Sequence, residues 1–97
     1  MKIIKTKFRD LKIIKHNNFA DKRGFLKFTY NKKIINWDNF IFDYLAYSKK
    51  NVFRGFHFQY KNQQAKLISV IKGKVLDCVV DLRKNSKTFG QSYKITM

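Results

Sequence analysis

The fold class is indicated most strongly by residues 66–82, KLISVIKGKVLDCVVDL. Two strand-like apolar runs occupy 66–71 and 74–82. The dipeptide Lys72-Gly73 separates them, and a two-residue break that contains Gly is typical of a β-hairpin. We therefore expect an antiparallel hairpin that turns at Gly73.

Residues on either side of this stretch carry the same kind of signal. Apolar and polar side chains alternate with period two through 25–30 and 52–60, which is typical of strands. We expect further strands at 11–15, 40–47 and 92–96, and one or two helical turns at 31–37. Closely spaced strands joined by turns favour a jelly roll. The strand at 92–96 has no strand after it, so we expect a truncated domain.

Composition supports an all-β class. Thirty-five of the 97 residues are Val, Ile, Thr, Phe, Tyr or Trp, the residue types enriched in strands. Ala occurs three times and Glu is absent, so the Glu–Lys pairs that stabilise helices cannot form. The length allows one domain, which we expect to occupy 1–97.

The chain is strongly basic, with 22 Lys and Arg against six Asp and a formal net charge of +16. One interpretation is a nucleic-acid-binding β protein, because a basic surface binds phosphates. The alternative is an AT-rich coding sequence, which also explains the many Ile, Asn and Phe residues. The lysines are scattered and no known nucleic-acid-binding motif occurs, so nucleic acid is the disfavoured partner. A small anionic substrate, such as a sugar nucleotide, also suits a basic protein.

Other classes are excluded by simple features. No apolar run approaches the ~20 residues of a membrane helix, and the N-terminus lacks the apolar stretch of a secretory signal. Cys78 is the only cysteine, which excludes an internal disulfide. We expect a cytoplasmic protein that has no membrane partner.

The densest group of reactive side chains comprises Arg54, His57, Gln59 and Lys66. His57 fits two interpretations: a core histidine satisfied by a neighbour, or a general base that titrates near neutral pH. In the second interpretation, Arg54 and Lys66 are available to stabilise an anion or an oxyanion.

The same region resembles a known family. Residues 51–59 (NVFRGFHFQ), 64–83 (QAKLISVIKGKVLDCVVDLR) and 86–90 (SKTFG) are similar in order and spacing to the dTDP-4-dehydrorhamnose 3,5-epimerases. That family shows V-L-R-G-L-H-Y-Q, then Q-x-K-L-V-x-V, G-x-V-x-D-V-x-V-D-L-R and S-x-T-F-G. Residues 19–25 (FADKRGF) also resemble its F-x-D-x-R-G-F-F segment. The whole chain corresponds to the first half of the family domain.

The resemblance implies a fold and an activity. It implies a cupin-like jelly roll that forms a homodimer and needs no metal or other cofactor. It also implies epimerisation of dTDP-4-dehydro-6-deoxy-glucose at C3 and C5, in the biosynthesis of dTDP-rhamnose. By position, His57 would be the base and Lys66 would stabilise the enolate oxygen at C4. Arg54 and Gln59 would bind substrate.

Further positions follow from the same resemblance. Arg23 would reach the partner subunit's bound diphosphate, and Phe25 the nucleotide base. The family's proton-donating tyrosine and its histidine-orienting aspartate both lie in the other half of its domain. Phe28 stands where the family has Glu, and residues 42–44 (FDY) replace its Gln-Asp-Asn run.

A metal site is not expected. Metal-binding cupins use a His-x-His pair with a Glu, whereas here Gln59 takes the second His position and the chain has no Glu. Two alternatives to the epimerase remain open beside it: a catalytically weak sugar-nucleotide-binding remnant or one part of a split enzyme, and the basic nucleic-acid-binding β protein.

Overall fold

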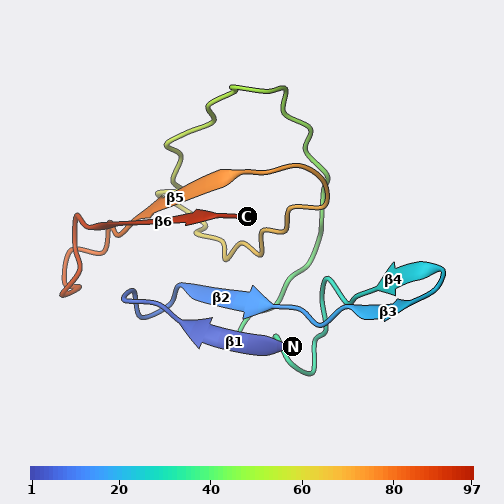
Figure 1. Ribbon diagram of the computed structural model, residues 1–97. Coiled ribbons are helices and arrows are strands. Elements are labelled where there is room, and N and C mark those ends of the chain that lie inside the picture. Colours follow the sequence, from blue (N-terminus) through green and yellow to red (C-terminus); the bar gives the residue numbers. More distant parts are fainter. The chain divides into compact units, whose positions relative to one another are not determined.

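The computed structural model describes residues 1–97 and contains six strands and no helix (Figure 1). The strands are β1 (Lys2–Lys5), β2 (Lys12–Lys15), β3 (Phe19–Asp21), β4 (Gly24–Leu26), β5 (Leu76–Val80) and β6 (Ser92–Thr96). They form three antiparallel pairs, β1 with β2, β3 with β4, and β5 with β6. No helix is available to cross a membrane. The expected all-β class is confirmed.

The chain divides into two compact units. The first unit consists of residues 1–30 and 69–97 and holds every strand. The second unit consists of residues 31–68 and has no strand. Whether 1–97 acts as one domain, as the length suggests, stays a prediction.

Strands β1 and β2 have the same sequence, KIIK, and pair so that like residues face each other. Isoleucine faces isoleucine in the middle of the ladder, and lysine faces lysine at both ends. The connecting turn is closed by Thr6, whose hydroxyl donates to the carbonyl of Leu11 at 2.8 Å and accepts from the N–H of Phe8 at 3.1 Å. Strand β2 confirms the expected strand at 11–15, whereas β1 was not anticipated from the sequence.

Strand β5 pairs with β6, and Val75 and Met97 extend the ladder by exchanging two backbone hydrogen bonds. The strands expected within 74–82 and at 92–96 are therefore present. The expected hairpin at Gly73 is wrong, because residues 66–71 form no strand and β5 finds its partner further along the chain. As expected, no strand follows 92–96 in the chain, and β6 pairs with the preceding β5.

Asp81 closes the loop that brings β6 back to β5. Its carboxylate is buried and accepts five hydrogen bonds, given by the following groups: the Arg83 N–H (3.0 Å), the Arg83 Nε and Nη2 (2.9 and 3.1 Å), and the Ser86 and Thr88 hydroxyls (2.6 Å each). Its backbone N–H donates to the Gln91 carbonyl, and its own carbonyl accepts from Gly90. A carboxylate is stable away from water only when its oxygens are paired in this way. The D-L-R segment (81–83) and the S-x-T-F-G segment (86–90) therefore form one hydrogen-bonded cluster, here called the Asp81 cluster.

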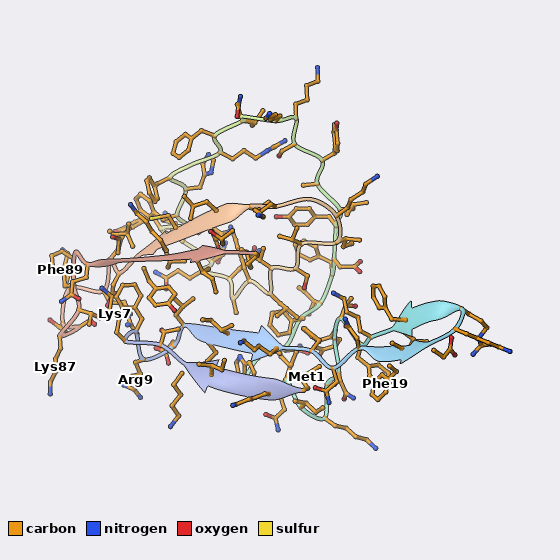
Figure 2. All side chains as sticks on the ribbon, in the orientation of Figure 1. Met1, Lys7, Arg9, Phe19, Lys87 and Phe89 are labelled. Carbon is orange, nitrogen blue, oxygen red and sulfur yellow. The ribbon has the colours of Figure 1, made fainter.

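The Asp81 cluster also contacts the β1–β2 turn within the first unit. Arg83 Nη1 donates to the carboxylate of Asp10 at 2.6 Å. Nearby, the buried ring of Phe8 contacts the ring of Tyr93, with centroids 6.3 Å apart. These two contacts join the β1–β2 turn to the β5–β6 pair. In Figure 2, labels mark Lys7 and Arg9 in the β1–β2 turn and Lys87 and Phe89 in the 81–91 loop.

The second unit begins with a hydrogen-bonded turn at Asn31–Ile35. The N–H of Ile35 donates to the Asn31 carbonyl at 2.8 Å, and the Ile35 side chain is fully buried. This turn takes the place of the expected helical turns at 31–37. The strands expected at 40–47, 52–60 and 66–71 are wrong, because none of these segments has a ladder partner in the chain. Strand β4 also ends at Leu26, well short of the expected 25–30.

The hydrogen bonds of the Asp81 cluster lead to a prediction about stability. Thr88→Val removes one hydroxyl donor from Asp81 but keeps the shape of the side chain. We expect the free energy of unfolding to fall by about 1–2 kcal/mol, since a hydrogen bond to a charged group is lost. Chemical denaturation measures the change. Thr29→Val is the matched control, because Thr29 is exposed and makes no hydrogen bond; equal stability of the two variants would contradict the assignment.

A second prediction concerns pH. Arg83 first, and then the Ser86 and Thr88 hydroxyls, hold the pKa of Asp81 far below its ordinary 3.8. The unfolded chain therefore binds a proton at acid pH that the folded chain does not, and stability falls as pH drops below about 4. We expect Asp81→Asn to lower the thermal midpoint at pH 7 and to flatten its decline in acid. Asp38→Asn, at an exposed position, should keep the wild-type decline; a wild-type decline in Asp81→Asn would refute the role of Asp81.

Candidate functional site

Arg54 is the best-defined side chain of the predicted site. Its Nε donates to the Ser48 hydroxyl at 2.8 Å, and its Nη2 donates to the Tyr47 carbonyl at 3.0 Å. A turn makes these contacts possible, since the Val52 N–H donates to the Lys49 carbonyl at 3.4 Å. The chain from 47 to 54 is thereby folded back on itself.

The backbone conformations in this turn suit the residues that occupy them. Asn51 has a φ of 64°, in the left-handed region that Asn tolerates better than most residues do. Gly55 has a φ of 140°, where a side chain would be strained. On either side of Gly55 the rings of Phe53 and Phe56 meet edge to face, with centroids 6.1 Å apart. The sequence R-G-F at 54–56 is therefore fixed by local geometry.

His57, Gln59 and Lys66 are all exposed. The core-histidine interpretation of His57 is wrong, since its side chain is open to solvent. No hydrogen bond or ion pair joins His57 to Lys66 or Gln59, and neither His57 nor Lys66 lies on a strand. An exposed, unpartnered imidazole and ammonium are nevertheless free to meet a ligand. Their assignment to a catalytic site stays a prediction.

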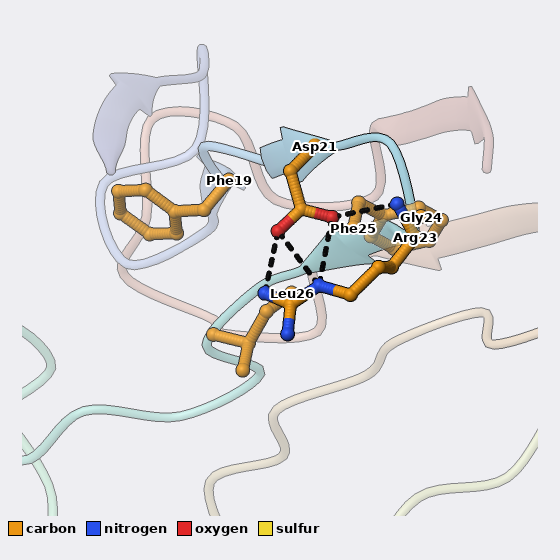
Figure 3. A pocket seen from close by; sticks show the side chains of 6 residues that line it. All are labelled: Phe19, Asp21, Arg23, Gly24, Phe25 and Leu26. Carbon is orange, nitrogen blue, oxygen red and sulfur yellow. Dashed lines mark hydrogen bonds and ion pairs between the residues drawn. The ribbon is translucent and has the colours of Figure 1, made fainter.

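Arg23 and Phe25 lie on the β3–β4 hairpin. Together with Phe19, Asp21, Gly24 and Leu26 they line a hollow (Figure 3). The Arg23 guanidinium donates two hydrogen bonds to Oδ2 of Asp21, from Nη2 at 2.7 Å and from Nε at 3.2 Å. The backbone N–H of Arg23 donates to Oδ1 of the same carboxylate at 2.8 Å. These bonds hold Arg23 against the turn of the hairpin. Phe25 is exposed beside it, where an aromatic ring can stack on a ligand.

The Asp21–Arg23 pair also sets the charge state of the hairpin. The guanidinium first, and the backbone N–H second, hold the pKa of Asp21 below 3.8, and Asp21 raises the pKa of Arg23. Both groups are therefore charged at neutral pH. Elsewhere, no three His, Cys, Asp or Glu side chains lie close enough together to hold a metal ion.

Two partners of the predicted site residues were missed in the sequence, namely Asp21 and Ser48. The Asp-x-Arg spacing of Asp21 and Arg23 in a turn region is a signal that could have found the first pair. Ser48 lies six residues before Arg54, and no periodicity connects them. They meet across the turn at Lys49–Val52, in which Asn51 has a left-handed conformation.

Comparison with known proteins agrees with the motifs. The sequence profile of the family described as dTDP-4-dehydrorhamnose 3,5-epimerase matches residues 5–97. The enzyme of that name from Salmonella typhimurium is 43% identical over 97 residues, which cover 94% of this chain and 53% of that protein. The enzyme of the same name from Methanothermobacter thermautotrophicus is 38% identical over 94 residues, which cover 93% of this chain and 51% of that protein.

A solved structure is similar as well. The crystal structure of dTDP-4-dehydrorhamnose 3,5-epimerase from Elizabethkingia anophelis NUHP1 aligns with a TM-score of 0.86 and 38% identity. The alignment covers 100% of this chain and 56% of that one. The chain thus spans about half the length of the relatives it matches. These likenesses confirm the expected cupin-like, all-β fold class, and the chain belongs to the dTDP-4-dehydrorhamnose 3,5-epimerase family.

Proposed function

We propose that the protein epimerises dTDP-4-dehydro-6-deoxy-glucose at C3 and C5, which yields dTDP-4-dehydro-L-rhamnose. The observation that carries the proposal is the block from Arg54 to Lys66, which lies inside the family match and keeps the arginine, the histidine and the lysine in order. Relatives named for this activity are 34–43% identical over most of the chain.

The proposed chemistry follows from the residue types. Neutral His57 removes the proton from the carbon beside the C4 ketone. The electron pair of that C–H bond forms a C=C bond to C4, and the π pair of the carbonyl moves to the C4 oxygen. The Lys66 ammonium stabilises the resulting enolate. Return of a proton to the opposite face of the carbon inverts its configuration. A general base and a cation beside the carbonyl oxygen are the two groups that the first half of this reaction needs.

Substrate binding is proposed for the arginines and their neighbours. Arg54 and Gln59 would bind the sugar nucleotide from the second unit. Arg23 would contact diphosphate and Phe25 the base from the β3–β4 hairpin, in the active site of a partner copy. The proposal therefore includes a homodimer in the cytoplasm, with no nucleic-acid partner. A guanidinium suits a diphosphate because its planar fork matches pairs of oxygens.

A sugar-nucleotide-binding remnant, or one part of a split enzyme, is the second candidate function. It is favoured by one observation, namely that His57 and Lys66 are exposed and no hydrogen bond joins them. Proton removal and inversion separate the two candidates, because removal needs only His57 and Lys66, whereas inversion also needs an acid on the opposite face.

The proposed role of His57 predicts an exchange reaction. The protein is incubated with dTDP-4-dehydro-6-deoxy-glucose in D₂O, and NMR follows loss of the C3 and C5 proton signals and appearance of the inverted sugar. We expect exchange to outpace inversion in the 97-residue chain. We expect His57→Ala to slow exchange about 10²–10⁴-fold, the usual contribution of a general base.

His16→Ala is the matched control, since it removes the other histidine, whose Nδ1 makes no hydrogen bond. Equal exchange by wild type and His57→Ala would remove His57 from the reaction. Absence of exchange in the wild type would favour the binding remnant. Full inversion by the wild type would show that Tyr60, Tyr93 or another group of this chain supplies the acid.

The proposed reaction also predicts the metal content. Polarisation of the ketone is assigned to Lys66, and Gln59 stands where metal-binding cupins place their second histidine. We expect elemental analysis of the purified protein to find no stoichiometric iron, zinc or manganese, and exchange to survive treatment with a chelator. One equivalent of any of these metals per chain would contradict the assignment.

A further inference from the structure

The hydrogen bonds of Arg54 leave one particular edge of its guanidinium available. An arginine has five N–H donors, one on Nε and two on each terminal nitrogen. The Nε donor is taken by the Ser48 hydroxyl, and one Nη2 donor is taken by the Tyr47 carbonyl. The two nitrogens that make these bonds, Nε and Nη2, share one edge of the planar group. The opposite end, formed by Nη1 and the second N–H of Nη2, keeps its donors.

The acceptors that hold Arg54 are uncharged, which distinguishes this arginine from two others in the chain. Arg23 is paired with Asp21, and Arg83 is paired with Asp81 and Asp10. No ion pair involves Arg54. Its orientation is therefore fixed without any loss of its net positive charge, and the whole charge remains for an anionic ligand.

We infer that Ser48 is a positioning residue, which presents the outer edge of Arg54 to the diphosphate of the nucleotide sugar. This inference rests on the proposed function and adds a role for a residue outside the R-G-F-H-F-Q block. A long side chain normally loses much rotamer freedom when a ligand fixes it, and a guanidinium that is already held loses less. The diphosphate fits because its paired oxygens match a two-donor edge.

The local geometry explains why serine serves at this position. The turn at Lys49–Val52 returns the chain so that the short Ser48 hydroxyl lies 2.8 Å from Nε. Alanine offers no acceptor there, whereas threonine keeps the hydroxyl. Ser48 is exposed, so neither substitution opens a cavity.

The test is the binding of thymidine diphosphate, measured by calorimetry with the wild type and three single variants. We expect Ser48→Ala to weaken binding roughly 2–10-fold, the equivalent of one hydrogen bond between polar groups. Ser48→Thr should restore the wild-type affinity. Ser69→Ala, at an exposed serine without a hydrogen bond, should leave the affinity unchanged. Thermal midpoints identify any variant that fails to fold.

A double-mutant comparison separates positioning from a general structural effect. In an Arg54→Ala background, Ser48→Ala should weaken binding no further, because the residue through which Ser48 acts is gone. An equal loss in both backgrounds, or unchanged binding by Ser48→Ala in the wild-type background, would overturn the inference alone. Failure of the wild type to bind thymidine diphosphate would overturn the proposed function, and the inference with it.

Discussion

The first unit depends above all on the hydrogen bonds accepted by the buried carboxylate of Asp81. This carboxylate gathers the donors of Arg83, Ser86 and Thr88 and thereby closes the loop between β5 and β6. Since Arg83 also reaches Asp10, the same group ties the β1–β2 turn to this loop. Residues that a motif search treats as a family signature serve here to hold two hairpins together. Their positions in the sequence are dictated by what one desolvated carboxylate requires.

The positions of strands were easier to predict from the sequence than the pairing of those strands. The apolar run that ends before Asp81 and the stretch at 92–96 both form strands, because their side chains suit a pleated surface. The pairing expected across Gly73 was wrong, since a nearby apolar run was preferred to a distant one. The periodicity of apolar residues does not predict that hydrogen bonds to a buried carboxylate close the loop that brings β6 beside β5. Alternation predicts a strand at 52–60, and aromatic residues predict one at 40–47, yet neither segment pairs with a strand and most of their side chains stay exposed.

For the candidate site, the functional residues could be predicted from the sequence, but the contacts that hold them in place could not. Arg54, His57 and Lys66 stand out because charged and titratable groups rarely gather in an aromatic stretch. The contact between Arg54 and Ser48 forms across a turn in which Asn51 has a left-handed backbone conformation. No sequence pattern predicts that conformation. Exposure of His57 was equally unreadable, because flanking phenylalanines suggest burial.

The β1–β2 ladder has a consequence for how this protein responds to ionic strength. Lys2 faces Lys15 and Lys5 faces Lys12, although like charges directly opposite each other destabilise a strand pair. The Thr6 turn sets this register in spite of the repulsion. Dissolved ions screen such repulsion over a Debye length of about 10 Å at 0.1 M. In a chain of net charge +16, moderate salt therefore favours the folded hairpin, the reverse of its effect on proteins held by surface ion pairs.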